Sequence, residues 1–197
     1  MVGYVDHALW RISGSMVRSH LTFHRLMSIM RTSIRNFRPD DIEALVRLYN
    51  RYIEETTITF DITPHTVEQR REHWLSHYHS AGRHRLLIAE CDEKVVGYAS
   101  SSQFRTKAAY DTSVETSIYV DMSFHGKGLG TQLYTALFDV LKTEDVHRAY
   151  AGITMPNDVS VAIHKKFGFK QVGLFKEVGR KFGRYWDVAW FEKEINE

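Results

Sequence analysis

A glycine-rich segment is the clearest candidate for chemistry in this sequence. It runs His125-Gly126-Lys127-Gly128-Leu129-Gly130, and three of the chain's 12 glycines fall within its last five residues. It lies between an alternating, β-branched run at residues 114–120 and a run of helical apolar spacing at residues 131–142. Glycine lets the backbone approach a ligand closely, and the first N–H groups of a helix attract anions. The segment therefore predicts a phosphate-binding loop, with a flexible glycine turn as the alternative; it has neither the Walker nor the dinucleotide-binding pattern.

Two further groups of reactive residues carry less weight. His73 and His77 are four residues apart on a predicted helix, a spacing seen in metal sites. No third ligand accompanies them, so an exposed helix face is favoured and no metal is predicted. Cys91 is the only cysteine and cannot form an internal disulfide. Nothing near it in the sequence indicates a nucleophile, and a reducing, cytoplasmic location is expected.

Composition limits the classes of protein that remain. The chain has 197 residues, of which 43% are hydrophobic and 25% charged, as in an ordinary globular domain. No apolar run reaches the roughly 18 residues that a membrane span needs, so a membrane protein is excluded. The net charge is +2, but residues 1–33 carry +3 and the remainder carries −1. A nucleic-acid partner is not expected, because the body lacks the basic surplus that such binding requires.

The basic residues 1–33 form a distinct N-terminal extension. Three interpretations stay open: an upstream start or dispensable arm, a helix packed on the body, or an organelle transit peptide. Residues 34–197 mix helix and strand patterns throughout and predict one α+β domain. Strands are expected at residues 34–37, 86–90, 95–103, 114–120, 149–154, 169–176 and 187–192, and helices from residue 42, at 67–80, 131–142 and 157–167.

Local details accompany these elements. Asp40 and Thr66 are expected to cap the first two helices. Trp74 and Leu75 are expected to point inward from the second helix. Cys91-Asp-Glu-Lys94 separates two apolar runs and predicts a hairpin turn.

With these elements in order, the sequence resembles the GNAT N-acetyltransferases. Their acetyl-CoA loop has the pattern Gln/Arg-x-x-Gly-x-Gly/Ala between a strand and a helix, and here His125 replaces the Gln or Arg. A second family block matches residues 157–169, with His164 where tyrosine is usual. More specifically, the body resembles the phosphinothricin and methionine sulfoximine acetyltransferases. The matching segments are Tyr52-Ile-Glu-Glu-Thr-Thr-Ile-Thr-Phe60, Tyr110 with Val114-Glu-Thr-Ser-Ile-Tyr-Val120, Pro156-Asn157-Asp158 and Gly183-Arg-Tyr-Trp186-Asp187-Val188.

The resemblance implies a GNAT fold, a mixed and mostly antiparallel sheet flanked by helices, and roles in acetyl transfer to an amine. Glu115 would be the general base, directly or through a water. His164 would protonate the leaving thiolate, or alternatively bond a neighbour within its helix. Backbone N–H groups near Ile118, Tyr119 and Val120 would bind the oxyanion. Asn157 would bond the pantetheine arm, cap its helix or do both. The remaining expected acetyl-CoA contacts are His125, Gly126, Lys127, Gly128, Leu129, Gly130 and Ser160.

The amine substrate is expected to be a small amino acid or analogue. Arg105 would grip its carboxylate, unless Arg105 pairs with an acid such as Asp111. Phe60 and Trp186 would line the side-chain pocket or be core aromatics, with Tyr110 nearby. Lys181, in a loop at residues 179–183, would contact a phosphinate or sulfone-like oxygen. Direct transfer by a homodimer is expected; the alternatives are a protein or peptide acetyltransferase, or a CoA-binding sensor without turnover.

Overall fold

The computed structural model describes residues 32–196, which combine helices and strands in one α+β fold. Most of the proposed N-terminal extension therefore lies outside the described residues. Thr32 and Ser33 are an exception, because they already belong to the first strand. The strands are β1 Thr32–Asn36, β2 Arg85–Cys91, β3 Lys94–Gln103, β4 Ser113–Val120, β5 Arg148–Met155, β6 Lys170–Lys181 and β7 Arg184–Glu194. The helices are α1 Ile42–Glu55, α2 Val67–His77, α3 Leu129–Leu141 and α4 Asp158–Lys166, with 3₁₀ turns at Pro39–Asp41, Ala108–Tyr110 and Met122–Phe124.

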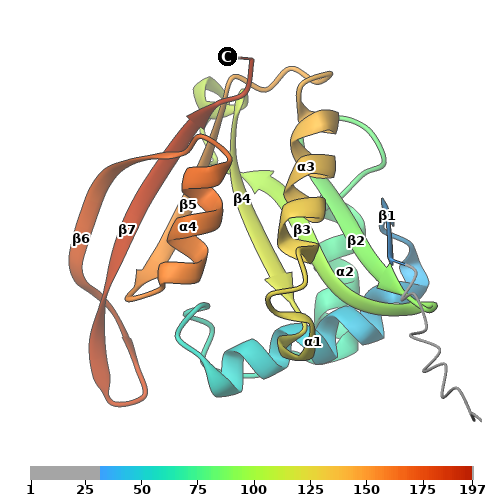
Figure 1. Cartoon of the computed structure of the whole chain (residues 1–197), viewed down its shortest axis with the longest axis horizontal. Helices are drawn as coiled ribbons and strands as arrows, with labels where there is room; N and C mark the ends of the chain where they lie inside the picture. Colours follow the sequence, from blue (N-terminus) through green and yellow to red (C-terminus); the bar gives the residue numbers. More distant parts are fainter. Residues whose placement is uncertain (1–31, 197) are drawn as a thin grey trace, which may run out of the picture.

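The seven strands form one twisted sheet in the order β1-β2-β3-β4-β5-β7-β6. Among the strands of residues 32–196 only β4 and β5 run parallel, so the predicted mixed, mostly antiparallel sheet is confirmed. Helices cover both faces (Figure 1). On one face α3 packs against a core that includes Val114, Leu133 and Leu137. On the other face α1 and α2 pack against a smaller, aromatic core that includes Tyr52, Trp74 and Tyr98.

The two parallel strands separate partway along their length. β4 and β5 pair only from Ser113 to Glu115, opposite Arg148 to Tyr150. Beyond that point they diverge, and the gap between the two ribbons is visible in Figure 1. At the fork, the Thr116 hydroxyl donates to the carbonyl oxygen of Tyr150 at 3.2 Å. The second half of β4 therefore has one edge paired with β3 and the other edge free of β5.

Several local predictions are confirmed. Thr66 caps α2 in a reciprocal capping box with Gln69, and Trp74 is buried. The β2–β3 hairpin turns at Asp92 and Glu93, both with positive φ, as a tight two-residue turn requires.

Other local predictions are wrong. Asp40 does not cap α1: a 3₁₀ turn precedes the helix, and Asp41 at its N-cap position instead binds the Arg35 guanidinium with both carboxylate oxygens at 2.7 Å. Leu75 is 41% exposed, because it lies next to Trp74 on the helix and turns away from the core. The predicted loop at residues 179–183 is the end of a long hairpin, in which only Phe182 and Gly183 lie between β6 and β7.

Candidate functional site

The glycine-rich segment leads directly into the first turn of α3. Gly128 is the N-cap residue of this helix, with φ of +79°, and Gly126 has φ of +75°. A side chain rarely tolerates this left-handed backbone, which explains both glycines. Within the described residues no side chain caps the first turn of α3, and that turn carries no acidic residue. The helix start therefore presents uncapped N–H groups and a positive dipole end, the arrangement that binds phosphate.

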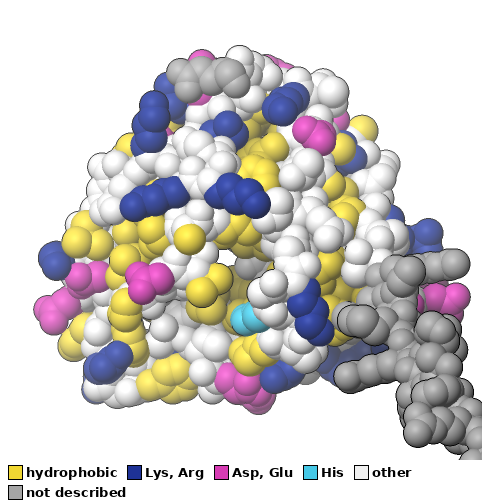
Figure 2. All heavy atoms as spheres, viewed as in Figure 1, with side chains coloured by type: hydrophobic (Ala, Val, Ile, Leu, Met, Phe, Trp, Pro, Cys, Tyr) yellow, Lys and Arg dark blue, Asp and Glu magenta, His cyan; other side chains and the backbone are white. Residues whose placement is uncertain are grey.

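The third glycine of the segment has a packing role. A Cβ at Gly130 would lie 2.9 Å from Cδ1 of Ile163, so glycine lets the start of α3 approach α4 closely. Lys166, at the end of α4, donates to the Thr131 hydroxyl at 3.2 Å. The ammonium of Lys127 lies over the Phe124 ring, 4.6 Å from its centroid. Positive charge therefore lies on both sides of the helix start. Figure 2 shows the same face hollowed between α4 and β4.

The His125 side chain is hydrogen-bonded within the chain. Its Nε2 lies 3.0 Å from the carbonyl oxygen of Val120 and 3.1 Å from the Tyr52 hydroxyl. Tyr52 in turn donates to the same carbonyl at 2.5 Å. The histidine therefore ties the loop to the end of β4 and to α1. His125 is nevertheless exposed, so its ring stays accessible from the surface beside the loop.

The free edge of β4 presents alternate backbone groups. Asp121 N donates to Val96 O at 2.8 Å, so odd-numbered residues of this strand direct their N–H and C=O groups toward β3. Even-numbered residues direct theirs toward the gap beside β5. The Val120 N–H already faces the Tyr52 hydroxyl at 3.4 Å. Of the three predicted oxyanion donors, Ile118 is thus the residue whose N–H faces the gap, whereas the N–H of Tyr119 faces β3.

Glu115 lies on this strand at the last pair before the fork. Its neighbours Val114 and Ile118 pack into the α3 core, and Tyr119 packs into the aromatic core under α1 and α2. Because side chains alternate along a strand, the Glu115 carboxylate is on the α1–α2 side. Burial raises the pKa of this carboxyl, and the positive charge of Arg105 partly opposes the shift. A half-buried carboxylate with a raised pKa is suited to accept a proton near neutral pH.

His164 is buried, with an exposed fraction of 3%. Its Nδ1 lies 2.7 Å from the carbonyl oxygen of Ser160, and its Nε2 lies 2.9 Å from the Tyr134 hydroxyl. A carbonyl can only accept, so Nδ1 carries the proton and Nε2 accepts from Tyr134. Burial also lowers the pKa of His164, which keeps the ring neutral. This geometry favours the alternative stated for His164, a helix histidine bonded to its neighbours, over a general acid that faces the thiolate.

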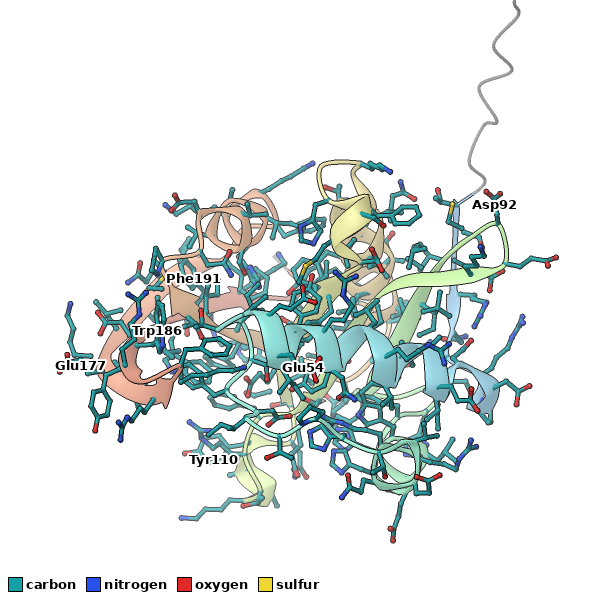
Figure 3. All side chains as sticks on the ribbon, turned by 90° about the horizontal axis from the view of Figure 1, so that it is seen from below. Glu54, Asp92, Tyr110, Glu177, Trp186 and Phe191 are labelled. Atoms are coloured by element: carbon teal, nitrogen blue, oxygen red, sulfur yellow. The ribbon has the colours of Figure 1, made fainter. Side chains whose placement is uncertain are left out.

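The residues at the start of α4 cap that helix. The Asn157 side chain accepts from the backbone N–H of Ser160 at 3.0 Å, so the capping role predicted for Asn157 is confirmed. Asn157 also lines a surface cavity of about 370 Å³, together with Trp186 and Phe182 from the β6–β7 hairpin and residues 55–58 from the end of α1. In Figure 3, Trp186 extends inward from the hairpin toward the C-terminal end of α1. The cavity thus brings Asn157, from the family block at residues 157–169, together with Trp186, which was predicted to line the substrate pocket.

The other predicted substrate residues differ in their exposure. Arg105 is exposed; its guanidinium stacks 4.5 Å from the Phe104 ring centroid and donates to Phe104 O at 3.4 Å. The alternative pairing with Asp111 is not found in the described part of the chain. Tyr110, labelled in Figure 3, is 44% exposed. Its ring packs edge-on against Phe104. Arg105 and Tyr110 therefore form part of the rim near Glu115 and keep their freedom to contact a ligand.

Lys181 and Phe60 instead hold two segments together. The Lys181 ammonium is buried and donates to the carbonyl oxygen of Thr59 at 2.8 Å. The Phe60 ring lies directly against the backbone of Gly179. The expected contact between Lys181 and a substrate oxygen is thus replaced by a contact within the chain. The loop after α1 closes onto the β6–β7 hairpin.

Sequence reasoning missed three residues of this region. Tyr52 binds the end of β4, Tyr134 binds His164, and Thr116 bridges the fork. Each was assigned to an ordinary helix or strand position. Tyr52 and Tyr134 are almost fully buried with their hydroxyls hydrogen-bonded, and a tyrosine at a core position of an amphipathic helix is the signal that could have indicated such a partner.

Comparison with known proteins agrees with this geometry. Residues 34–190 match the family described as acetyltransferase (GNAT) domain. The chain belongs to the GNAT acetyltransferase family. It is 52% identical over 158 residues to the phosphinothricin N-acetyltransferase of Streptomyces coelicolor. The aligned region covers 79% of this chain and 92% of that protein.

More distant members of the GNAT family also match. The L-methionine sulfoximine/L-methionine sulfone acetyltransferase of Pseudomonas paraeruginosa is 30% identical over 167 residues, 85% of this chain and 96% of that protein. The solved GNAT phosphinothricin acetyltransferase of Sinorhizobium meliloti, in complex with AcCoA, is 26% identical. It superposes with a TM-score of 0.77 over 84% of this chain and 89% of that one. The predicted GNAT fold is thus confirmed.

Proposed function

We propose that this GNAT acetyltransferase transfers the acetyl group of acetyl-CoA to the amino group of a small amino acid or amino-acid analogue. The observation that carries the proposal is the placement of Glu115. It is a half-buried carboxylate on the one strand whose free edge leads into an uncapped, glycine-rich helix start. The named relatives support the substrate class, because they act on phosphinothricin or on methionine sulfoximine and sulfone.

The residues present fit acetyl-CoA. Its pyrophosphate needs backbone donors and a positive environment, which the turn at Gly126–Gly128 and the start of α3 offer. A Cβ at either glycine would meet nothing within 4 Å, so the space in front of the loop is open. The pantetheine arm needs backbone partners, and the unpaired edge of β4 offers it the C=O of Ile118. When bound, acetyl-CoA supplies the activated acetyl group.

The chain supplies a base and an oxyanion donor. Glu115 accepts the proton of the substrate's ammonium group, and the N–H of Ile118 binds the oxyanion that develops on the acetyl group. A strand rises about 3.3 Å per residue, so the two residues are about 10 Å apart along the backbone. A water that relays the proton to Glu115 therefore fits this spacing better than direct contact. With His164 neutral and bonded on both nitrogens, the thiolate takes its proton from solvent.

The closed loop favours a small substrate over a peptide. A peptide acetyltransferase needs an open groove between residues 56–60 and the β6–β7 hairpin. Here Phe60 packs on Gly179 and Lys181 binds Thr59, so the two segments are joined there, and the opening left between them is the cavity of about 370 Å³ beside Asn157. The alternative of a CoA sensor without turnover is disfavoured because a half-buried carboxylate, Glu115, lies at the start of the unpaired edge of β4, where a base for acetyl transfer is needed.

The test is a free-thiol assay with acetyl-CoA and a panel of amines. The panel contains phosphinothricin, methionine sulfoximine, methionine sulfone, the ordinary amino acids and peptides with free N-termini. Thiol release with one or more of the small amino acids, and none with peptides, is the expected result. Thiol release with peptides alone would indicate a peptide acetyltransferase instead. Release with none of the amines would refute the proposed function.

We further propose that the protein is a homodimer. β6 is an edge strand of the sheet, and it forms with β7 a hairpin on which six large apolar residues are exposed. They are Val172, Leu174, Phe175, Val178, Phe182 and Tyr185. An apolar edge of this length is usually covered by a partner. Sedimentation at micromolar concentration, with Val178→Lys as the disrupting variant, tests this point. No helix among residues 32–196 is long and apolar enough to cross a membrane, and the cytoplasmic location stays a prediction.

A further inference from the structure

Phe60 and Gly179 make an unusually close contact. A Cβ added at Gly179 would lie 2.0 Å from Cε2 of Phe60 and 2.5 Å from Cδ2 and Cζ. No side chain can occupy that space while the ring stays in place. Gly179 is not among the glycines with positive φ, so its backbone conformation is open to other residues. Glycine is needed at position 179 for the close approach of a ring, and not for the shape of the strand.

A second link joins the same two segments next to this contact. The buried Lys181 ammonium donates to the carbonyl oxygen of Thr59, the residue before Phe60. The Thr59 hydroxyl is hydrogen-bonded to the Tyr49 hydroxyl of α1 at 2.7 Å. The indole N–H of Trp186 donates to the carbonyl oxygen of Lys181 at 2.9 Å. The loop is therefore attached to the hairpin by one apolar and one charged contact, and the hairpin end is braced by Trp186.

These links lie beside the cavity that contains Asn157. One wall of the cavity is formed by Thr56, Thr57 and Ile58, which belong to the loop. The opposite wall is formed by Phe182 and Trp186, which belong to the hairpin. The distance between the walls depends on how the loop is seated on the hairpin. A displaced Phe60 would move the first wall, because residues 56–58 immediately precede Thr59 and Phe60.

We propose that Gly179 is a specificity-determining position: its missing side chain seats Phe60 on the hairpin, and this contact sets the size of the amine that the pocket accepts. The inference rests on the proposed function, because it concerns the amine side of the same site. The Lys181–Thr59 bond acts with it as a positioning contact and does not touch the substrate. Acetyl-CoA binding, which we assign to the β4 edge and the start of α3, should not depend on the contact, because Asn157 is on the α4 side of the cavity and not on the loop.

The test compares Gly179→Ala with Gly173→Ala. Both glycines are on β6 and neither has positive φ, but a Cβ at Gly173 would meet nothing within 4 Å. kcat/KM is measured for α-amino acids whose side chains grow from alanine through norvaline to methionine sulfone. We expect Gly179→Ala to change the preference between small and large side chains by about tenfold, the scale of one methylene in a pocket. The change should appear in KM for the amine, with KM for acetyl-CoA and the preference of Gly173→Ala unchanged.

A double variant tests whether the effect passes through Phe60. In a Phe60→Ala background the added methyl group at residue 179 has nothing to displace. Gly179→Ala should then have no further effect on the size preference. An equal effect with and without Phe60, or a size preference in Gly179→Ala that matches the wild type, would overturn the proposal. If Gly179→Ala does not fold, Phe60→Leu is the test variant, because it loosens the same contact without adding atoms. An unchanged preference between small and large amines in Phe60→Leu would then overturn the proposal.

The role of Gly179 in holding the loop can be tested even if the protein acetylates no amino acid. If the wild type acetylates no amino acid, the proposed function fails while the seating of the loop can still be measured. Hydrogen exchange of the amides in residues 56–61 should then be faster in Gly179→Ala than in the wild type, and unchanged in Gly173→Ala. Equal exchange in all three proteins would show that Gly179 does not hold the loop.

Discussion

Replacing Glu115 by glutamine tests the proposed base most directly. Glutamine has nearly the same shape and volume, so the half-buried position is filled as before. The described residues offer this carboxylate no hydrogen bond or ion pair, so the substitution breaks no structural contact there. The loss should therefore be catalytic. Removal of a general base costs about 10²–10⁴-fold in turnover, which corresponds to about 2.7–5.5 kcal/mol in the activation barrier.

The pH dependence gives this prediction its second readout. In the wild type, kcat/KM should fall at acid pH as Glu115 becomes protonated. Burial raises the pKa of this carboxyl, so the fall begins above the usual range of a glutamate. Glu115→Gln should lack this limb. Its residual activity should rise about tenfold per pH unit, following the fraction of free amine, until the amine's own pKa is passed.

The controls separate catalysis from binding and folding. Calorimetry should give the same acetyl-CoA affinity for both proteins, because the Glu115 side chain is on the opposite face of β4 from the α3 core. The melting temperature should change little. Turnover within threefold of the wild type at neutral pH, with the same pH profile, would remove Glu115 from the mechanism.

The remaining predictions concern the loop, the rim, the chain start and the core. Gly128→Val forces a β-branched residue to φ of +79°, at a cost of about 1–2 kcal/mol or more, and calorimetry should show acetyl-CoA binding at least about tenfold weaker; an unchanged affinity would contradict the phosphate loop. Arg105→Ala should lower kcat/KM for amino acids, but not for their amides, by a factor that corresponds to about 1.5–3 kcal/mol of lost transition-state stabilisation. It should also move the acid limb of the pH profile to higher pH, because a positive charge that lowers the pKa of Glu115 is lost. Equal losses on both substrates would refute carboxylate binding. A chain that begins at Met30 keeps β1 and every site residue, so it should fold and transfer acetyl groups, whereas an insoluble product would make the arm structural. Tyr134→Phe removes the donor to the buried Nε2 of His164 and should cost about 1–3 kcal/mol of unfolding free energy in urea, without shifting the pH profile of kcat.

The elements that sequence patterns predicted well are those whose pattern is local. The apolar spacing of α1 follows from one buried face, and six of its residues, including Leu45 and Tyr52, are buried as expected. The two residues Asp92 and Glu93 turn a hairpin because the apolar runs on either side are strands. The glycine-rich loop was predicted because glycines at three alternate positions indicate positive φ or a close backbone approach, and this inference does not depend on distant residues.

The contacts that escaped prediction join residues far apart in the sequence. Lys181 was expected to face a substrate, but the carbonyl oxygen of Thr59 lies within reach only after the sheet has brought β6 next to the loop. Likewise, the sequence did not predict the full length of β6 and β7, because the exposed, apolar hairpin that they form lacks the alternating polarity of a half-buried strand. The proton position on His164 depends on Tyr134, which is 30 residues away.

The placement of the proposed base and the proposed oxyanion donor follows from the two alternations of a single strand, that of the side chains and that of the backbone groups. Glu115 directs its backbone groups toward β3 and its side chain toward α1 and α2, so the ladder fixes its main chain and leaves the carboxylate free to act. Ile118, three residues later, has the opposite arrangement: its side chain is held in the α3 core, and its N–H is free at the gap. A shift of one residue in the β3–β4 register would exchange the two arrangements and remove both proposed functions at once. Gly97 opposes such a shift, because it lies opposite Val120 where a Cβ would come within 2.9 Å of Tyr119 O, and any larger residue of β3 moved to that place would collide with β4.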